Sequence, residues 1–270
     1  MDAEYAGQPR SGRFTVLALR STTAKDAHVK NCSTHIRQIV VVVPVHNEED
    51  LLQQALSSLA RSRASVEDVE VRTIVVLDAC SDNSAKIAAE WAARTDESSV
   101  ISVDFRNVGS ARAAGFRAAE GHAELSGTNL HETWYATTDA DSTCRPDWLA
   151  SHLRHAQRGA QAVAGTVRVD LDSAPAGLER AYRAGYRNQL GHRHVHGANL
   201  ALRADVYRAV GGFRSLPTGE DVDLIHRVEG SSIPVLYACD SPVSTSNRRD
   251  GRAPEGFAGH LRNLEAAMTQ

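Results

Sequence analysis

The hydrophobic residues in the first half of the chain fall into short, unbroken runs separated by amphipathic segments. The run at residues 39–44, IVVVVP, is almost entirely β-branched, which is typical of a strand buried on both faces of a parallel sheet. Similar runs occupy residues 73–77, 100–104 and 134–138. We interpret the four runs as consecutive strands of one sheet.

The segments between these strands have apolar residues every three or four positions, which predicts helices. The first helix has its apolar stripe at residues 51–59, and we expect Asn47 to cap it, with the acidic residues 48–50 in its first turn. Further helices are predicted over residues 82–93 and 109–119. Strands and helices that alternate at this spacing predict a Rossmann-like α/β fold, in which helices flank an open, mostly parallel sheet.

The second half of the chain is less regular. Its pattern predicts strands at residues 161–169 and 197–203. Helices are predicted over residues 175–190, 204–210 and 220–228, the second of them ended by a pair of glycines. No internal repeat or low-complexity segment interrupts this pattern.

The length of 270 residues suits a single domain. We place this domain at residues 38–244, with one half over 38–143 and a second half over 144–244. Residues 1–37 are interpreted as an N-terminal appendage. Residues 245–270, which are rich in Arg, Gly and Pro, are interpreted as a mobile C-terminal segment.

Composition excludes several kinds of partner. The chain is 42% hydrophobic and 23% charged, with a net charge of -3 spread over both signs, so it lacks the basic surface expected for binding nucleic acid. Four widely spaced cysteines suggest reduced thiols. The sequence has no apolar run of about 18 residues and no basic-then-apolar leader. We expect a cytoplasmic protein without a transmembrane segment; peripheral attachment to a membrane and a homodimer stay open.

Polar residues follow each of the four predicted strands. They lie at residues 46–48, 78–81, 106–109 and 139–141. Because ligands bind beyond the carboxyl ends of the strands in open α/β sheets, we expect these loops to meet at one edge and form a site.

These strand ends, together with two later motifs, resemble the family 2 glycosyltransferases of the GT-A fold. The resemblance extends over residues 39–236, in the family's order, through VVVPVHNEEDLL, VVLDACSDNS, NVGSARAAGF, TTDADS, GANLALR…VGGF and GEDVDL. It implies transfer of a sugar from a nucleoside-diphosphate donor of the UDP or GDP type. It also implies that residues 38–143 form a nucleotide-sugar-binding half and residues 144–244 an acceptor-binding half. The acceptor would be a small molecule, a glycan or a lipid-linked compound, and it stays unassigned.

The resemblance implies that the loops after the first two strands bind the nucleotide. Val45, His46 and Glu48 match the positions that contact base and ribose, and Asp78 matches an aspartate that bonds to the base. The family usually has a second acid and then glycine after this aspartate, where this chain has Ala79 and Cys80, so the base stays open. An alternative is that these residues only cap a helix or form a turn.

Arginines are the candidates for binding the donor diphosphate. Arg112 follows a tight Asn/Gly turn, and a cation near a helix N-terminus favours a diphosphate; we assign this contact to Arg112 rather than Arg117. The resemblance also implies that Arg248, Arg249 and Arg252 fold over the diphosphate. In each case a solvated surface arginine is the alternative.

Two aspartates one residue apart, Asp139 and Asp141, are the candidate metal site. Alternation at a strand end turns them to the same side, and carboxylates with phosphate oxygens are ligands for Mn2+ or Mg2+. The resemblance implies that Asp141 is the more direct metal ligand. Asp139 would contact the nucleotide and could also approach the metal. The chain has two further Asp-x-Asp pairs, at 170/172 and 221/223; we interpret the first as surface.

The second half carries the candidate acceptor residues. The resemblance of GEDVDL to an acceptor-side motif implies that Asp221 is the general base, with Glu220 orienting the site or contacting the acceptor. The same acids also suit the start of a helix. His196, Gly197 and Asn199 match the pocket between donor and acceptor. Attack from the face opposite the leaving group predicts inversion at the sugar carbon.

His192, His194 and His196 alternate and could share one face of a strand around a metal such as zinc. Without a distant fourth ligand, we favour a polar approach to the acceptor.

Two other classes remain as alternatives. One is a nucleotidyltransferase, which would have a glycine-rich basic loop after the first strand. A dehydrogenase or a P-loop enzyme would have its own glycine motif at the same place. The segment VPVHNEEDL contains no glycine, which argues against all three. A non-catalytic nucleotide-sugar-binding protein would bind donor without turnover.

Overall fold

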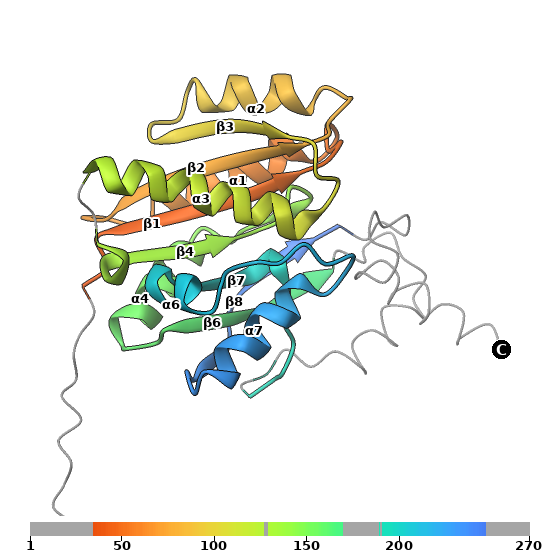
Figure 1. Cartoon of the computed structure of the whole chain (residues 1–270). Coiled ribbons are helices and arrows are strands. Elements are labelled where there is room, and N and C mark those ends of the chain that lie inside the picture. The colour runs from red at the N-terminus through yellow and green to blue at the C-terminus, as the bar shows by residue number, and fades with distance from the viewer. Residues whose placement is uncertain (1–34, 127–128, 170–188, 190, 247–270) are drawn as a thin grey trace, which may run out of the picture. The chain divides into compact units, whose positions relative to one another are not determined.

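The computed structural model describes residues 35–126, 129–169, 189 and 191–246. Within these ranges the strands form one sheet, in the order β3-β2-β1-β4-β7-β6-β8-β5 (Figure 1). The strands are β1 (Gln38–Val45), β2 (Glu70–Asp78), β3 (Ser98–Val103), β4 (Thr133–Thr137), β5 (Ser142–Thr143), β6 (Ala162–Val169), β7 (Leu200–Arg203) and β8 (Val235–Thr245). The α-helices are α1 (Leu52–Arg63), α2 (Ser84–Ala92), α3 (Val108–Ser126), α4 (Trp148–Gln157), α6 (Ala204–Ala209) and α7 (Glu220–Gly230), with short 3-10 turns η1 (Leu130–Glu132) and η2 (Gly197–Asn199).

The first half forms the predicted parallel sheet. β1 pairs in parallel with β2 and with β4, and β2 pairs in parallel with β3. Residues of β1 from Gln38 to Val43 are all buried, as their unbroken apolar run predicts for a strand covered on both faces. The four predicted strands are therefore confirmed.

The second half adds strands of mixed direction. β7 is antiparallel to β4 and β6, β8 is parallel to β6, and β5 is antiparallel to β8. Four described elements were not predicted: the short turn η1, the two-residue β5, α4 and the 11-residue β8. β8 escapes the strand pattern because Asp240 and Pro242 interrupt its apolar residues, and because its pairing with β6 is irregular between Gly165 and Val167.

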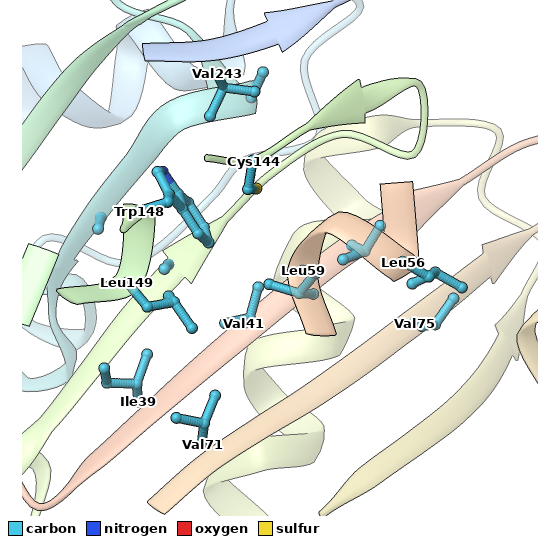
Figure 2. Packing of buried hydrophobic residues seen from close by; sticks show 14 of the residues in the cluster. Ile39, Val41, Leu56, Leu59, Val71, Val75, Cys144, Trp148, Leu149 and Val243 are labelled. Carbon is cyan, nitrogen blue, oxygen red and sulfur yellow. The ribbon is translucent and has the colours of Figure 1, made fainter. Parts of the chain in front are cut away.

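Helices cover both faces of the sheet and create two cores. On one face the sheet packs against α1, α2 and α4, with Leu56, Leu59 and Trp148 at the centre of the packing (Figure 2). On the other face α3, α6 and α7 bury Phe116, Tyr207 and neighbouring apolar residues. Each large apolar side chain buried in this way contributes about 1.5–3 kcal/mol.

The start of the first helix differs from the prediction. Asn47 does not cap α1, which begins at Leu52 without a side-chain cap and without acids in its first turn. Asn47 instead has a left-handed backbone with φ 54°, and its side chain accepts a hydrogen bond from the N–H of Ser81 at 2.7 Å. The prediction was wrong because residues 47–49 bond across to the loop after β2, which a one-dimensional pattern does not reveal.

Several predicted segments lie outside the described residues. They are most of the N-terminal appendage, most of the helix predicted over 175–190, the surface pair Asp170 and Asp172, and almost all of the C-terminal segment. The proposed domain boundaries stay predictions.

Candidate active site

The ends of four neighbouring strands bring the predicted loops to one edge of the sheet (Figure 1). Near the end of β1, Val45 is in register with Leu77 of β2, and Val42 is in register with Thr137, the last residue of β4. Asp78 at the end of β2 is in register with the last residue of β3. Because these strands are parallel, the loops that follow them all leave the sheet on the same side.

The loops after β1 and β2 are tied to each other. The Nδ1 atom of His46 lies 2.6 Å from the carbonyl oxygen of Asp78, so it is this ring nitrogen that donates. The backbone N–H of the buried Glu48 donates to the hydroxyl of Ser84 at 2.7 Å. The first contact places His46 beside Asp78, and both are residues predicted to bind the nucleotide.

Asp78 holds the loop after β3. Its Oδ1 atom accepts hydrogen bonds from the N–H groups of Phe105 (2.7 Å) and Arg106 (2.8 Å), and its Oδ2 atom accepts one from Asn107 (2.8 Å). The residue is only 3% exposed. Asp78 is therefore a structural anchor of this edge; its predicted bond to the nucleotide base stays a prediction.

Arg112 lies in a buried ionic cluster beneath the edge. Its Nη2 atom lies 2.6 Å from Oδ1 of Asp139, and its Nη1 atom is ion-paired with Oε1 of Glu220. Burial alone would lower the pKa of Arg112, but the carboxylates of Asp139, Glu220 and Asp221 outweigh burial and raise it. One guanidinium thus joins a residue after β4 to the first residue of α7. The predicted contact of Arg112 with a diphosphate stays a prediction.

The two candidate metal ligands have different surroundings. The pKa of Asp139 is raised above its usual range, first by burial and then by repulsion from Asp141 and Glu220, while Arg112 acts in the opposite direction. Asp141 is half-buried and accepts hydrogen bonds from the hydroxyls of Ser142 (3.2 Å) and Ser246 (2.9 Å). These two contacts of Asp141 come from neutral hydroxyls, whereas Asp139 is ion-paired with Arg112.

The carboxylates of Asp139 and Asp141 fit a divalent ion that is also bound by the phosphates of a nucleotide. Within the described ranges no three His, Cys, Asp or Glu side chains gather as a protein-only metal cage. Mg2+ and similar ions in nucleotide sites need only one or two carboxylates besides phosphate oxygens and water. Asp141 and Asp139 repel each other, and a bound divalent cation would relieve this repulsion.

Asp221 is held in place beside the cluster. α7 begins at Glu220, as predicted. The Oδ2 atom of Asp221 accepts a hydrogen bond from the N–H of Gly197 at 2.7 Å, and Oδ1 accepts one from the N–H of Val222 at 2.8 Å. Asp221 is half-buried, whereas Glu220 is only 6% exposed. Asp221 is therefore more exposed than Glu220, and its predicted role as general base stays a prediction.

Comparison with known proteins now decides the family. The profile described as "Glycosyl transferase family 2" matches residues 40–208, more than half of the chain. The chain belongs to glycosyl transferase family 2. A curated relative from Proteus mirabilis, undecaprenyl-phosphate 4-deoxy-4-formamido-L-arabinose transferase, is 35% identical over 141 residues. That match covers 51% of this chain and 39% of the relative, so the chain spans well under half of the relative's length.

Solved structures support the fold of this family 2 chain. A mannosyltransferase from Pyrobaculum calidifontis, solved with GDP-Man and Mn2+, superposes with a TM-score of 0.61 at 18% identity, covering 87% of this chain and 71% of that one. TarS of S. aureus, solved with UDP, superposes with a TM-score of 0.57 at 15% identity, covering 85% and 64%. The predicted fold, a GT-A type open sheet flanked by helices, is confirmed.

The alternating histidines at residues 192, 194 and 196 do not form a metal site among the residues that the structure describes. His192 is buried, and its Nε2 atom donates to the carbonyl oxygen of Ala238 at 3.0 Å, while Nδ1 accepts from the N–H of His194. The rings of His192, His194 and His196 stack, with centroids 5.5 Å and 6.2 Å apart. Stacked rings do not direct their nitrogens at one point, so the zinc alternative loses its geometric basis.

Asn199 is a hydrogen-bond centre of the fold. Its Oδ1 accepts from Trp148 Nε1 (2.9 Å) and from His152 Nε2 (3.2 Å), and its Nδ2 donates to the carbonyl oxygens of Thr166 (2.8 Å) and Ser241 (3.0 Å). The residue is 1% exposed. With every amide position used, the side chain supports the predicted pocket from beneath, and a contact with acceptor stays a prediction.

An open groove of about 750 Å³ is lined by Val222, the residue that follows Asp221 in the sequence. It lies between α7, residues 193–195 and the first residues of β8. Its aliphatic lining is formed by Val195, Val222, Ile233, Pro234 and Val235. One wall carries the ion pair of Arg193 with Glu229, 2.8 Å apart. No pattern in the sequence pointed to this groove, because its walls come from three separate segments.

Besides the pairing of Arg112 with Glu220, two contacts of the site were not predicted from the sequence. Ser246, which lay in the segment interpreted as mobile, donates its N–H to the carbonyl oxygen of Asp141 at 3.2 Å as well as its hydroxyl to the carboxylate. Gly197 was assigned to the pocket, but its bond to Asp221 was not foreseen. Predicting β8 would have revealed the first contact. The predicted diphosphate ligands Arg248, Arg249 and Arg252 lie outside the described residues.

Proposed function

We propose that this chain transfers a sugar from a nucleoside-diphosphate sugar of the UDP or GDP type to an acceptor hydroxyl or amine, with inversion. One observation carries the proposal: Arg112 bonds to both Asp139 and Glu220. It joins the candidate metal loop after β4 to the helix of the candidate base, although the two are far apart in the sequence. Family membership adds the reaction class.

The donor nucleotide would bind at the loops after β1 and β2. Val45, His46 and Glu48 flank this position, and Asp78 fixes the neighbouring loop. The two solved structures described above were obtained with GDP-Man and with UDP, which supports a nucleotide ligand at this edge. The chain's own residues here bind and orient the donor.

Asp141 would hold Mn2+ or Mg2+ together with the donor phosphates, with Asp139 beside it on the nucleotide side. Such an ion neutralises the charge that develops on the nucleoside diphosphate as the sugar departs. Ser142 and Ser246 orient the Asp141 carboxylate through their hydroxyls. The presence of Mn2+ in the mannosyltransferase structure is consistent with this choice of ion.

Asp221 would act as the general base. As the acceptor oxygen attacks the sugar carbon, its proton passes to the Asp221 carboxylate. The N–H groups of Gly197 and Val222 hold this carboxylate in place. A base on the face opposite the leaving nucleotide gives inversion of the sugar carbon.

The curated relative suggests a second acceptor class. Its name contains undecaprenyl phosphate, so a polyprenyl phosphate is the first lipid acceptor to test. A phosphate oxygen is already ionised near neutral pH and needs little help from a base. The two acceptor classes therefore predict different consequences for the loss of Asp221.

The groove lined by Val222 would receive the part of the acceptor that does not react. Val222, one residue after the candidate base, is 37% exposed and apolar. Val222→Glu places a charge on this lining and should raise the acceptor KM about tenfold, without changing donor affinity. An unchanged acceptor KM would remove the groove from the proposal.

No helix among the described residues is long and apolar enough to cross a bilayer.

The function is tested by product analysis. Purified protein would be incubated with UDP- and GDP-sugars, Mn2+ and a panel of acceptors that includes polyprenyl phosphate and hydroxyl compounds. Asp221→Asn should keep donor affinity and lose transfer to a hydroxyl by 100-fold or more, with much smaller losses for a phosphate acceptor. Asp223→Asn is the matched control, because Asp223 pairs with Arg214 and Arg227 away from the cluster.

Three outcomes would contradict the proposal. Transfer that survives in Asp221→Asn for a hydroxyl acceptor would remove Asp221 as base. Donor binding without turnover across the whole acceptor panel would favour a non-catalytic nucleotide-sugar-binding protein. Release of pyrophosphate from a nucleoside triphosphate and a sugar phosphate would favour a nucleotidyltransferase.

A further inference from the structure

The cluster around Arg112 suggests a role that its predicted contact with a diphosphate does not describe. The Arg112 side chain is 3% exposed, and its two partners come from opposite halves of the site. Asp139 follows β4, on the donor side. Glu220 begins α7 and is the immediate neighbour of Asp221, the proposed base.

The surrounding backbone is built to fit this guanidinium. A Cβ on Gly197 would overlap the guanidinium of Arg112, and a Cβ on Gly109 would overlap the carbonyl oxygen of Arg214 and approach the side chain of Glu220. The Phe213 ring lies over the guanidinium, with the Cζ atom 5.4 Å from its centroid. Glycine at both positions therefore lets α3, η2 and α7 close around Arg112.

The same contacts reach the base by two routes. Glu220 connects Arg112 to Asp221 along the chain. Gly197 lies against the guanidinium, and its N–H donates to Oδ2 of Asp221 at 2.7 Å. A shift of Arg112 would therefore move both supports of the Asp221 carboxylate.

Charge also favours a positioning role over a ligand role. The guanidinium directs one Nη atom to each of two carboxylates. No described residue accepts a bond from Nε, but this atom is itself buried. The Arg112 side chain is only 3% exposed, so a diphosphate would find little of it to contact. Displacing Glu220, whose side chain is 8% exposed, would also leave a buried carboxylate without its cation, which is unfavourable.

We propose that Arg112 is a positioning residue that fixes the helix of the base Asp221 relative to the metal loop at Asp139 and Asp141, and does not itself bind the donor. This inference rests on the proposed function for the role of Asp221. Its structural part, the coupling of Arg112 through Glu220 and Gly197, is measurable without turnover.

The proposal is tested with Arg112→Lys, Glu220→Gln and the double variant. A lysine keeps the charge but cannot bridge two carboxylates in a fork. Arg112→Lys should leave the Kd for UDP or GDP with Mn2+ within about threefold of wild type, and lower kcat at least tenfold. The exposed Arg117→Lys on the same helix is the matched control and should change neither value.

The double variant tests whether Arg112 acts through Glu220. Arg112→Lys should lower kcat by a smaller factor in the Glu220→Gln background than in wild type. We expect less than half of the wild-type factor, because the two side chains work as a unit. Independent factors that multiply would contradict the proposal. A loss of nucleotide affinity equal to the loss of kcat/KM would identify Arg112 as a donor ligand instead.

Hydrogen exchange keeps the inference testable if no donor is turned over. Arg112→Lys should accelerate amide exchange at Gly197 and Val222, whose N–H groups hold Asp221, and leave Phe105 and Arg106 on Asp78 protected. Unchanged exchange at Gly197 and Val222 would overturn the positioning role. An inactive wild type with the expected exchange pattern would instead count against the proposed function alone.

Discussion

The proposed donor side and the proposed acceptor side of the site are supported in different ways. On the donor side, loops that follow neighbouring strands bond directly to each other, and Asp78 accepts three backbone N–H groups. On the acceptor side, Asp221 depends on one N–H from a distant segment and on an ion pair made by its neighbour. The donor side is part of the folded core, whereas the acceptor side is an assembly of separate segments.

This difference predicts two kinds of response to substitution. Changes on the donor side should lower the free energy of unfolding, because they leave buried backbone donors without acceptors. Changes on the acceptor side should lower the rate more than the stability, because they displace one carboxylate by a small distance.

The largest expected effect is that of Asp78→Ala. It removes the acceptor for three N–H groups in a residue that is 3% exposed, and should lower the free energy of unfolding by about 4 kcal/mol. Asp78→Asn is the control, since its remaining oxygen still accepts from two of the groups, and it should cost about half as much. Urea denaturation measures both, and equal small losses would contradict an anchoring role.

Next in size is Gly197→Ala. The added Cβ overlaps the Arg112 guanidinium, so Asp221 is displaced and kcat should fall about 100-fold. Donor affinity should stay near that of wild type. Gly230→Ala, where a Cβ meets no atom within 4 Å, is the control. If Gly197→Ala weakens donor binding as much as it slows transfer, the two sides are not supported separately.

A moderate effect is expected from pH at His152. Burial lowers the pKa of this histidine from 6.5 to about 4, and its bond to Asn199 and the nearby His155 and Asp240 only adjust that shift. Between pH 6.5 and 4 the unfolded chain binds a proton that the folded chain does not, so stability falls as pH falls. The loss between pH 7 and 5 is about 2 kcal/mol.

The pH effect at His152 is measured by denaturation at both pH values. His152→Gln should lose most of this dependence, and the exposed His226→Gln should keep it. Identical pH dependence in wild type and His152→Gln would show that other groups cause it.

The smallest effect is expected at Asp240, on the outer surface of the acceptor half. Asp240 bonds to Ser151, His155 and Arg154, and these contacts hold its pKa below the usual range despite partial burial. Its side chain is 42% exposed, so Asp240→Asn should cost only about 0.5 kcal/mol near neutral pH. A loss above about 2 kcal/mol would mean that the surface network supports the fold more than the comparison allows.

The same contrast explains which parts could be predicted from sequence. The donor half follows from unbroken apolar runs such as residues 39–44, because a strand buried on both faces leaves a local signature. Motifs at strand ends then place Asp78, Asp139 and Asp141 on one edge by topology alone.

The acceptor half depends on contacts that have no local signature. The assignment of Glu220 and Asp221 came from resemblance, and nothing in the pattern showed that Arg112 would pair with Glu220. Asn199 was placed in a pocket because of its motif, while its four hydrogen bonds depend on α4, β6 and β8. Asn47 was misread for the same reason, since its partner Ser81 lies in another loop.

The central claim is that Asp141 holds the metal that accompanies the donor. Thermal denaturation of wild type and Asp141→Ala, with UDP- and GDP-sugars in the presence and absence of Mn2+, tests it most directly. The exposed Asp147→Ala is the matched control. We predict that one donor raises the Tm of wild type and Asp147→Ala only when Mn2+ is present, and leaves the Tm of Asp141→Ala unchanged. A donor-induced rise in Asp141→Ala equal to that of wild type in Mn2+ would contradict the account.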